Sequence, residues 1–182
     1  MDHDARIALQ QLKRLGMEEQ VAKDIAACPP TWRRMMNNFF GSEAWVRRLL
    51  TADRRTAWRF PLLMLYGRPM SGKTIFIEAL IQMLGPANCR EMRSGFYLDG
   101  SEKLCIIRGD STEVRYCAEL ISKHPRIPWV QELVSIDRGI LGVPRLFCQG
   151  QCIAHSDQER ADVVLRRLAS EEEQLRRWAR CS

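Results

Sequence analysis

The sequence predicts an α/β fold in which a mainly parallel sheet is preceded by a small all-helical segment. Three observations support this prediction. The apolar run from Phe60 to Tyr66 is short and is followed by a glycine, which is typical of a strand buried on both faces. A glycine-containing loop and a helical pattern follow this run directly. Beyond that helix, short apolar runs and helical patterns alternate along the chain, which favours a parallel sheet.

The composition is that of a globular chain. Its 182 residues are 46% hydrophobic, which is enough to bury one sizeable core. We see no apolar stretch long enough to span a membrane, and the charged start, Met1 to Asp4, is unlike a secretory signal. The cysteines are scattered and several lie in apolar runs, so we expect reduced core thiols in an intracellular protein. Cys148, Cys152 and His155 resemble part of a zinc site, but their spacing supplies no fourth ligand.

The chain is basic, with a net charge of +6. Residues 1–60 contribute much of this excess, since they hold 11 Lys and Arg against 7 Asp and Glu. Two interpretations stay open at this point. The basic residues form either a surface for a polyanion such as DNA or the solvated face of helices.

Residues 1–58 predict the all-helical segment. Apolar residues recur at helical spacing in four stretches, and the second ends where Pro29 and Pro30 remove amide donors. Thr31 and Ser42 are placed to cap the third and fourth helices. The four stretches lie at about 4–15, 18–27, 31–39 and 42–50.

Residues 59–169 predict the α/β core. After the strand at 60–66 we expect a helix over 73–84, which Gly85 and Pro86 end, and a second helix over 113–123. Residues 170–182 predict a C-terminal helix, because acidic residues begin this segment and arginines end it, as the helix dipole favours. Further apolar runs, which we interpret as strands, lie at 103–107, 129–136, 143–148, 151–154 and 161–165.

The segment between the first strand and its helix fits the pattern G-x-x-x-x-G-K-[ST] of a phosphate-binding loop. The glycines let backbone amides converge on a β-phosphate, and Lys73 supplies charge to the β- and γ-phosphates. The hydroxyl of Thr74 is placed to bind Mg²⁺. The sequence therefore predicts a nucleotide site. Its residues are Gly67, Arg68, Pro69, Met70, Ser71, Gly72, Lys73 and Thr74.

Four further stretches follow the loop in order, at 104–110, 134–138, 148–156 and 159–163. This order resembles the superfamily 3 helicase domain of small DNA viruses, as in the parvovirus Rep and nonstructural proteins and the papillomavirus replication helicase. The resemblance covers about residues 55–168. It implies a P-loop NTPase fold of the AAA+-like type that binds ATP and Mg²⁺.

The resemblance assigns a role to each stretch. Asp110 matches the second acid of the family's acidic pair and would bind Mg²⁺ with the loop threonine, whereas Gly109 stands where the first carboxylate belongs. The stretch at 134–138 looks like the start of the DNA-contacting hairpin, although the family's lysine is missing after it. Ser156, or as the second choice His155, would be the polar sensor at the nucleotide. Arg160 resembles the arginine that reaches a neighbouring subunit's nucleotide.

Some of these residues also have simpler interpretations. Asp110 is equally suited to cap the helix expected after it, and Arg160 is otherwise an exposed surface arginine. Asp99 and Glu102 are candidates to replace the missing carboxylate, because they lie close to the strand in sequence.

The resemblance implies an ATP-binding, helicase-like protein that acts in viral DNA replication or its regulation, with weak or absent motor activity. Its expected partners are single-stranded DNA and helicase-type subunits in a homo- or hetero-oligomer, in the host nucleus. Residues 1–58 contain one histidine, His3, so we expect no DNA-nicking nuclease. Two alternatives remain open: a small-molecule P-loop kinase with an arginine-rich lid at 160–167, and a DNA- or protein-binding regulator in which the loop is a relic.

Overall fold

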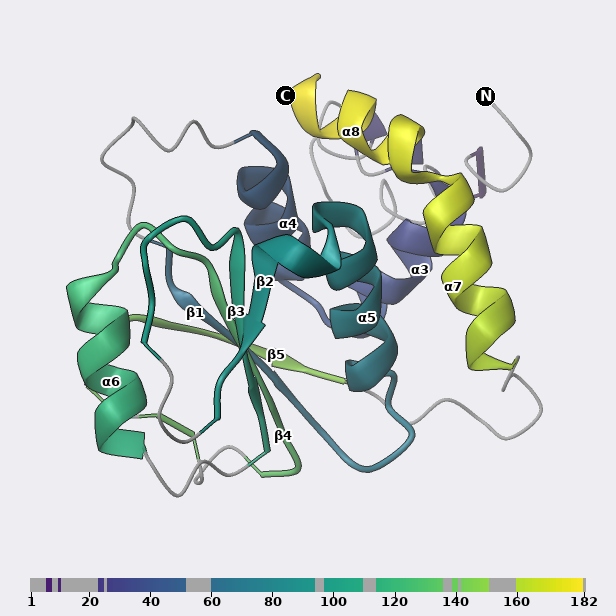
Figure 1. Ribbon diagram of the computed structural model, residues 1–182. Helices are drawn as coiled ribbons and strands as arrows, with labels where there is room; N and C mark the ends of the chain where they lie inside the picture. Colours follow the sequence, from purple (N-terminus) through teal and green to yellow (C-terminus); the bar gives the residue numbers. More distant parts are fainter. Residues whose placement is uncertain are drawn as a thin grey trace.

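The computed structural model describes residues 6–7, 10, 23–24, 26–51, 60–93, 97–109, 114–135, 139–140, 142–150 and 160–181. Within these ranges the protein is α/β, with a five-stranded parallel sheet and six α-helices (Figure 1), which confirms the predicted α/β class and its parallel sheet. The helices are α3 (Pro30–Asn38), α4 (Ser42–Thr51), α5 (Lys73–Leu84), α6 (Val114–Lys123), α7 (Ala161–Ser170) and α8 (Glu172–Arg180). The strands are β1 (Leu62–Tyr66), β2 (Cys89–Glu91), β3 (Leu104–Arg108), β4 (Trp129–Leu133) and β5 (Arg145–Gln149), and a 3₁₀ turn, η1 (Pro86–Asn88), precedes β2.

The strands are ordered β2-β3-β4-β1-β5, and every neighbouring pair is parallel. The first strand in sequence therefore lies inside the sheet, between β4 and β5. Because the strands are parallel, their carboxyl ends share one edge, where ligands bind in open α/β sheets. β1, β3 and β4 therefore all end at this edge.

Both faces of the sheet are covered, as the continuous apolar run of β1 predicts. Leu63 and Leu65 belong to a core cluster with residues of α3, α4, α5, α7 and α8. Leu62 and Met64 belong to a second cluster with residues of α6. Figure 1 shows α6 on one face of the sheet, whereas α3, α4, α5, α7 and α8 lie on the opposite face. None of the described helices has the length and apolar character needed to cross a bilayer.

Helix α3 is joined to the C-terminal helices α7 and α8 by hydrogen bonds. The carboxylate of Glu171, between α7 and α8, accepts hydrogen bonds from the amides of Thr31 and Trp32 and from the Thr31 hydroxyl. The indole of Trp32 donates to the Leu168 carbonyl at 2.8 Å. The prediction that Thr31 caps this helix is wrong, because α3 begins at Pro30 and the cap comes from a distant glutamate.

Several predicted boundaries also change. The helix over 73–84 is confirmed as α5, whereas the strand predicted from residue 60 begins at Leu62, after Pro61. The run at 161–165 is the start of helix α7, not a strand, because its apolar side chains Val164 and Leu165 pack on the helical layer. The strand predicted at 143–148 is β5, and the run at 151–154 lies outside the described residues.

Four of the described cysteines are core thiols, whereas Cys89 is partly buried and Cys181 is exposed. Cys28, Cys105, Cys117 and Cys148 are free and buried, and burial raises the pKa of Cys28 and of Cys148 to about 12. No group of three or more His, Cys, Asp or Glu in the described ranges is arranged to hold a metal. Of the residues considered for zinc, Cys152 and His155 lie outside these ranges.

Candidate functional site

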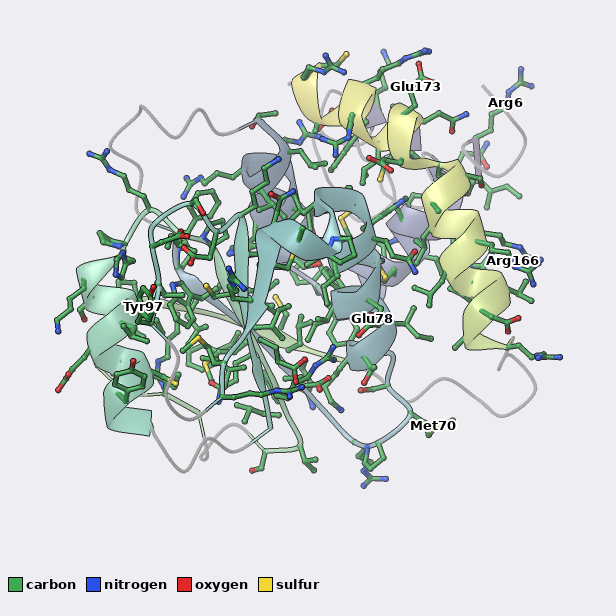
Figure 2. All side chains as sticks on the ribbon, viewed as in Figure 1. Arg6, Met70, Glu78, Tyr97, Arg166 and Glu173 are labelled. Atoms are coloured by element: carbon green, nitrogen blue, oxygen red, sulfur yellow. The ribbon has the colours of Figure 1, made fainter. Side chains whose placement is uncertain are left out.

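The predicted loop lies at the carboxyl edge of the sheet, between β1 and α5. Its two glycines are required by the backbone. Gly67 has a φ of +150°, and a Cβ on it would lie 2.7 Å from the carbonyl oxygen of Gly150, so no larger residue fits. Gly72 has a φ of +89° directly before the helix. Met70, at the exposed tip of the loop (Figure 2), also has a positive φ of 68°.

The amino end of α5 faces the loop. Gly72 precedes the helix and offers no side-chain cap, while its carbonyl accepts the first helical bond, from Phe76 N–H at 3.0 Å. The amides of a first helical turn have no acceptor within the helix, and the helix dipole places partial positive charge there. This end of α5 therefore suits an anionic ligand such as phosphate.

Lys73 lies across the loop. Its ammonium group donates to the Gly67 carbonyl at 2.7 Å, the Arg68 carbonyl at 2.9 Å and the Ser71 hydroxyl at 3.1 Å. The loop is also held by α3, since the side chain of Asn38 at the end of that helix donates to the Ser71 carbonyl at 2.7 Å. A cation is thus positioned over a backbone whose shape is fixed by a neighbouring helix.

Thr74, the last residue of the loop motif, contacts a carboxylate on the neighbouring strand. Its hydroxyl donates to Oε2 of Glu132, on β4, at 3.2 Å. The other oxygen of that carboxylate, Oε1, accepts a hydrogen bond from Arg108 Nη1 at 3.3 Å. Glu132 is mostly buried, with 17% of its side chain exposed. A hydroxyl and a carboxylate therefore face each other at the mouth of the loop.

Arg108, at the end of β3, lies among three carboxylates. It pairs with Glu78 on α5 at 2.6 Å, with Glu132 at 3.3 Å and with Glu91 on β2 at 3.8 Å. Figure 2 labels Glu78 on the helix beside the sheet. Burial alone would lower the pKa of Arg108, but the hydrogen bond to Glu78 and the charge of Glu132 outweigh it and raise that pKa. Arg108 therefore stays cationic and ties three strands to α5.

The other predicted site residues are not brought to the loop by any described contact. Asp110 and Ser156 lie outside the described residues. Arg160 directly precedes α7, with 85% of its side chain exposed, and pairs with Asp162 at 3.4 Å. Its role at a neighbouring subunit stays a prediction.

Asp99 and Glu102 cannot replace the missing carboxylate, because they precede β3 and therefore lie at the opposite edge of the parallel sheet. The length of β3, about 13 Å, separates them from that strand's carboxyl end. Both acids instead form a turn. Glu102 is 3% exposed and accepts bonds from the amides of Asp99 and Gly100, while Asp99 accepts from Ser101.

Sequence reasoning missed Glu132, Arg108 and Asn38. The available signal for Glu132 was a single charged residue inside the apolar run at 129–136. The backbone conformation at position 109 favours glycine, because φ there is +66°. This conformation is held by the Gly109 amide, which donates to the Glu132 carbonyl at 2.9 Å.

Comparison of the chain with protein-family models, with curated proteins and with solved structures finds no match.

Proposed function

We propose that this protein is a P-loop nucleotide-binding protein that holds ATP with Mg²⁺ at Gly67 to Thr74. The observation that supports this most directly is the arrangement at the loop: two glycines at positive φ, Lys73 lying across the backbone, and Thr74 against a carboxylate. Amides and an ammonium group are suited to phosphate oxygens, and a hydroxyl beside a carboxylate is suited to Mg²⁺.

The proposed fold type is the AAA+-like P-loop NTPase, and the proposed setting is viral DNA replication or its regulation in the host nucleus. The resemblance of 55–168 to superfamily 3 helicases is the support for this setting. Gly109 offers no carboxylate and the stretch after 138 offers no lysine, so the proposal is nucleotide binding with weak or absent motor activity. Single-stranded DNA and helicase-type subunits are the partners that this proposal includes.

The test is ATP binding by isothermal titration calorimetry, on wild type and Lys73→Ala. Lys123→Ala is the matched control, because Lys123 is exposed in the last turn of α6, on the opposite face of the sheet from α5. Loss of one charged hydrogen-bond donor costs about 1.5–3 kcal/mol, which is roughly a 10- to 150-fold loss of affinity. The proposal is lost if wild type does not bind ATP, or if Lys73→Ala binds it as well as Lys123→Ala does.

A further inference from the structure

We infer that Glu132 supplies the carboxylate that binds the Mg²⁺ of the nucleotide, in place of the side chain missing at Gly109. This inference rests on the proposed nucleotide binding at the loop. It assigns the metal to β4 rather than to the end of β3, where the resemblance expects it.

The strand order favours β4. Because the sheet runs β3-β4-β1, β4 is the direct neighbour of the strand that leads into the loop, and Glu132 is in register with Leu65 of β1. Adjacent strands lie about 4.8 Å apart, so a side chain at the end of β3 starts about one strand spacing farther from the loop. The amide of Gly67 also donates to the carbonyl of Leu133 at 3.2 Å, which joins the end of β4 to the start of the loop.

The donor atoms fit Mg²⁺. This ion prefers hard oxygen ligands in octahedral geometry and is held in proteins by one or two carboxylates together with phosphate oxygens and water. Two ligands on neighbouring octahedral positions lie about 2.9 Å apart. The oxygens of Thr74 and Glu132 are 3.2 Å apart, so a shift of a few tenths of an ångström would let both bind one ion.

Arg108 is the positioning residue for this carboxylate. It binds Oε1 of Glu132, which leaves Oε2 directed to Thr74. Arg108 is itself held by Glu78, which lies one helical turn after Thr74 on α5. Helix α5 therefore carries the Thr74 hydroxyl and, through Glu78, also holds Arg108, which orients the carboxylate of Glu132. As a result, the hydroxyl oxygen of Thr74 and Oε2 of Glu132 keep their relative position.

The test measures ATP affinity by calorimetry, in Mg²⁺ and in EDTA, on wild type, Glu132→Gln and Glu91→Gln. Glu91 is the matched control, because it also pairs with Arg108 but lies on β2, the outermost strand, which β3 and β4 separate from β1. We expect Mg²⁺ to strengthen ATP binding by wild type and by Glu91→Gln. In Glu132→Gln this gain should fall by at least about 10-fold, since loss of a group that only supports a metal ligand already costs about 10- to 100-fold. In EDTA, Glu132→Gln should bind ATP at least as tightly as wild type, since one negative charge is removed.

A second variant tests the ligand directly. A thiolate prefers softer metals than Mg²⁺, so Glu132→Cys should bind ATP more tightly with Cd²⁺ than with Mg²⁺, and Glu132→Gln should not. If wild type binds no ATP, the proposed function fails and this inference fails with it. If wild type gains affinity from Mg²⁺ and Glu132→Gln gains as much, the inference is overturned while nucleotide binding stands.

Discussion

Replacing Glu171 by alanine should destabilise the protein strongly, although this glutamate lies far from the loop. Its carboxylate is the cap of α3: it accepts bonds from Thr31 N–H at 3.0 Å, from the Thr31 hydroxyl at 2.7 Å and from Trp32 N–H at 3.2 Å. An N-terminal cap contributes about 1 kcal/mol, and a hydrogen bond to a charged group about 1.5–3 kcal/mol. Since these contributions overlap, we expect a loss of about 2–4 kcal/mol.

Urea unfolding followed by tryptophan fluorescence measures this loss. With a denaturant slope of about 2 kcal/mol/M, the midpoint should fall by about 1–2 M. Glu173→Ala is the control, because Glu173 is exposed and pairs only within its helix, with Arg177, among the contacts described for it. An exposed pair of this kind contributes less than about 1 kcal/mol. Equal midpoints for Glu171→Ala and Glu173→Ala would refute the capping argument.

Two further predictions concern Gly109 and the buried thiols. Gly109→Asp should lower the free energy of unfolding by about 1 kcal/mol or less, because φ is +66° there, in the left-handed region that Asp adopts more readily than most residues, and a Cβ would meet no atom within 4 Å. If Glu132 holds the metal, this substitution leaves the ATPase rate unchanged with and without single-stranded DNA, and a faster rate would show that the missing carboxylate limits turnover. The folded-state pKa of Cys28 and Cys148 is raised from 9.0 to about 12, so the folded state keeps protons that the unfolded state releases. Their stabilisation is full below pH 9 and is lost as pH rises towards 12, by roughly 1 kcal/mol per thiol at pH 10. Urea midpoints that stay constant between pH 8.5 and 10.5 would contradict this, and Cys148→Ala should reduce the dependence.

The loop and its flanking elements were predictable because their signals are local. A glycine after a buried apolar run, a lysine and threonine at a helix start, and Gly85 at its end all lie within about two dozen residues. The short strand β2 was not predicted, because Arg90 in its middle is exposed, the residues on either side are only partly buried, and the strand carries no apolar run.

The rest of the site could not be predicted because it depends on strand order and on distant contacts. Glu132 meets Thr74 only because β4 inserts between β3 and β1, and neither composition nor spacing encodes that order. Glu171 caps a helix that lies 140 residues away in sequence. The resemblance instead places the metal-binding carboxylate at position 109, where the backbone conformation favours glycine.

The loop motif alone does not make the site. Its shape depends on Asn38 from α3, on the carbonyl of Leu133 from β4, and on Gly150, whose carbonyl leaves no room for a side chain at Gly67. Glu171, between α7 and α8, caps one end of α3, and Asn38 at the other end of α3 contacts the loop. The C-terminal helices therefore influence the shape of the loop through α3. It follows that a change in α7 or α8 that frees α3 should alter the loop without touching it. A match to the loop pattern therefore indicates phosphate binding only where the surrounding sheet edge holds the backbone in this form.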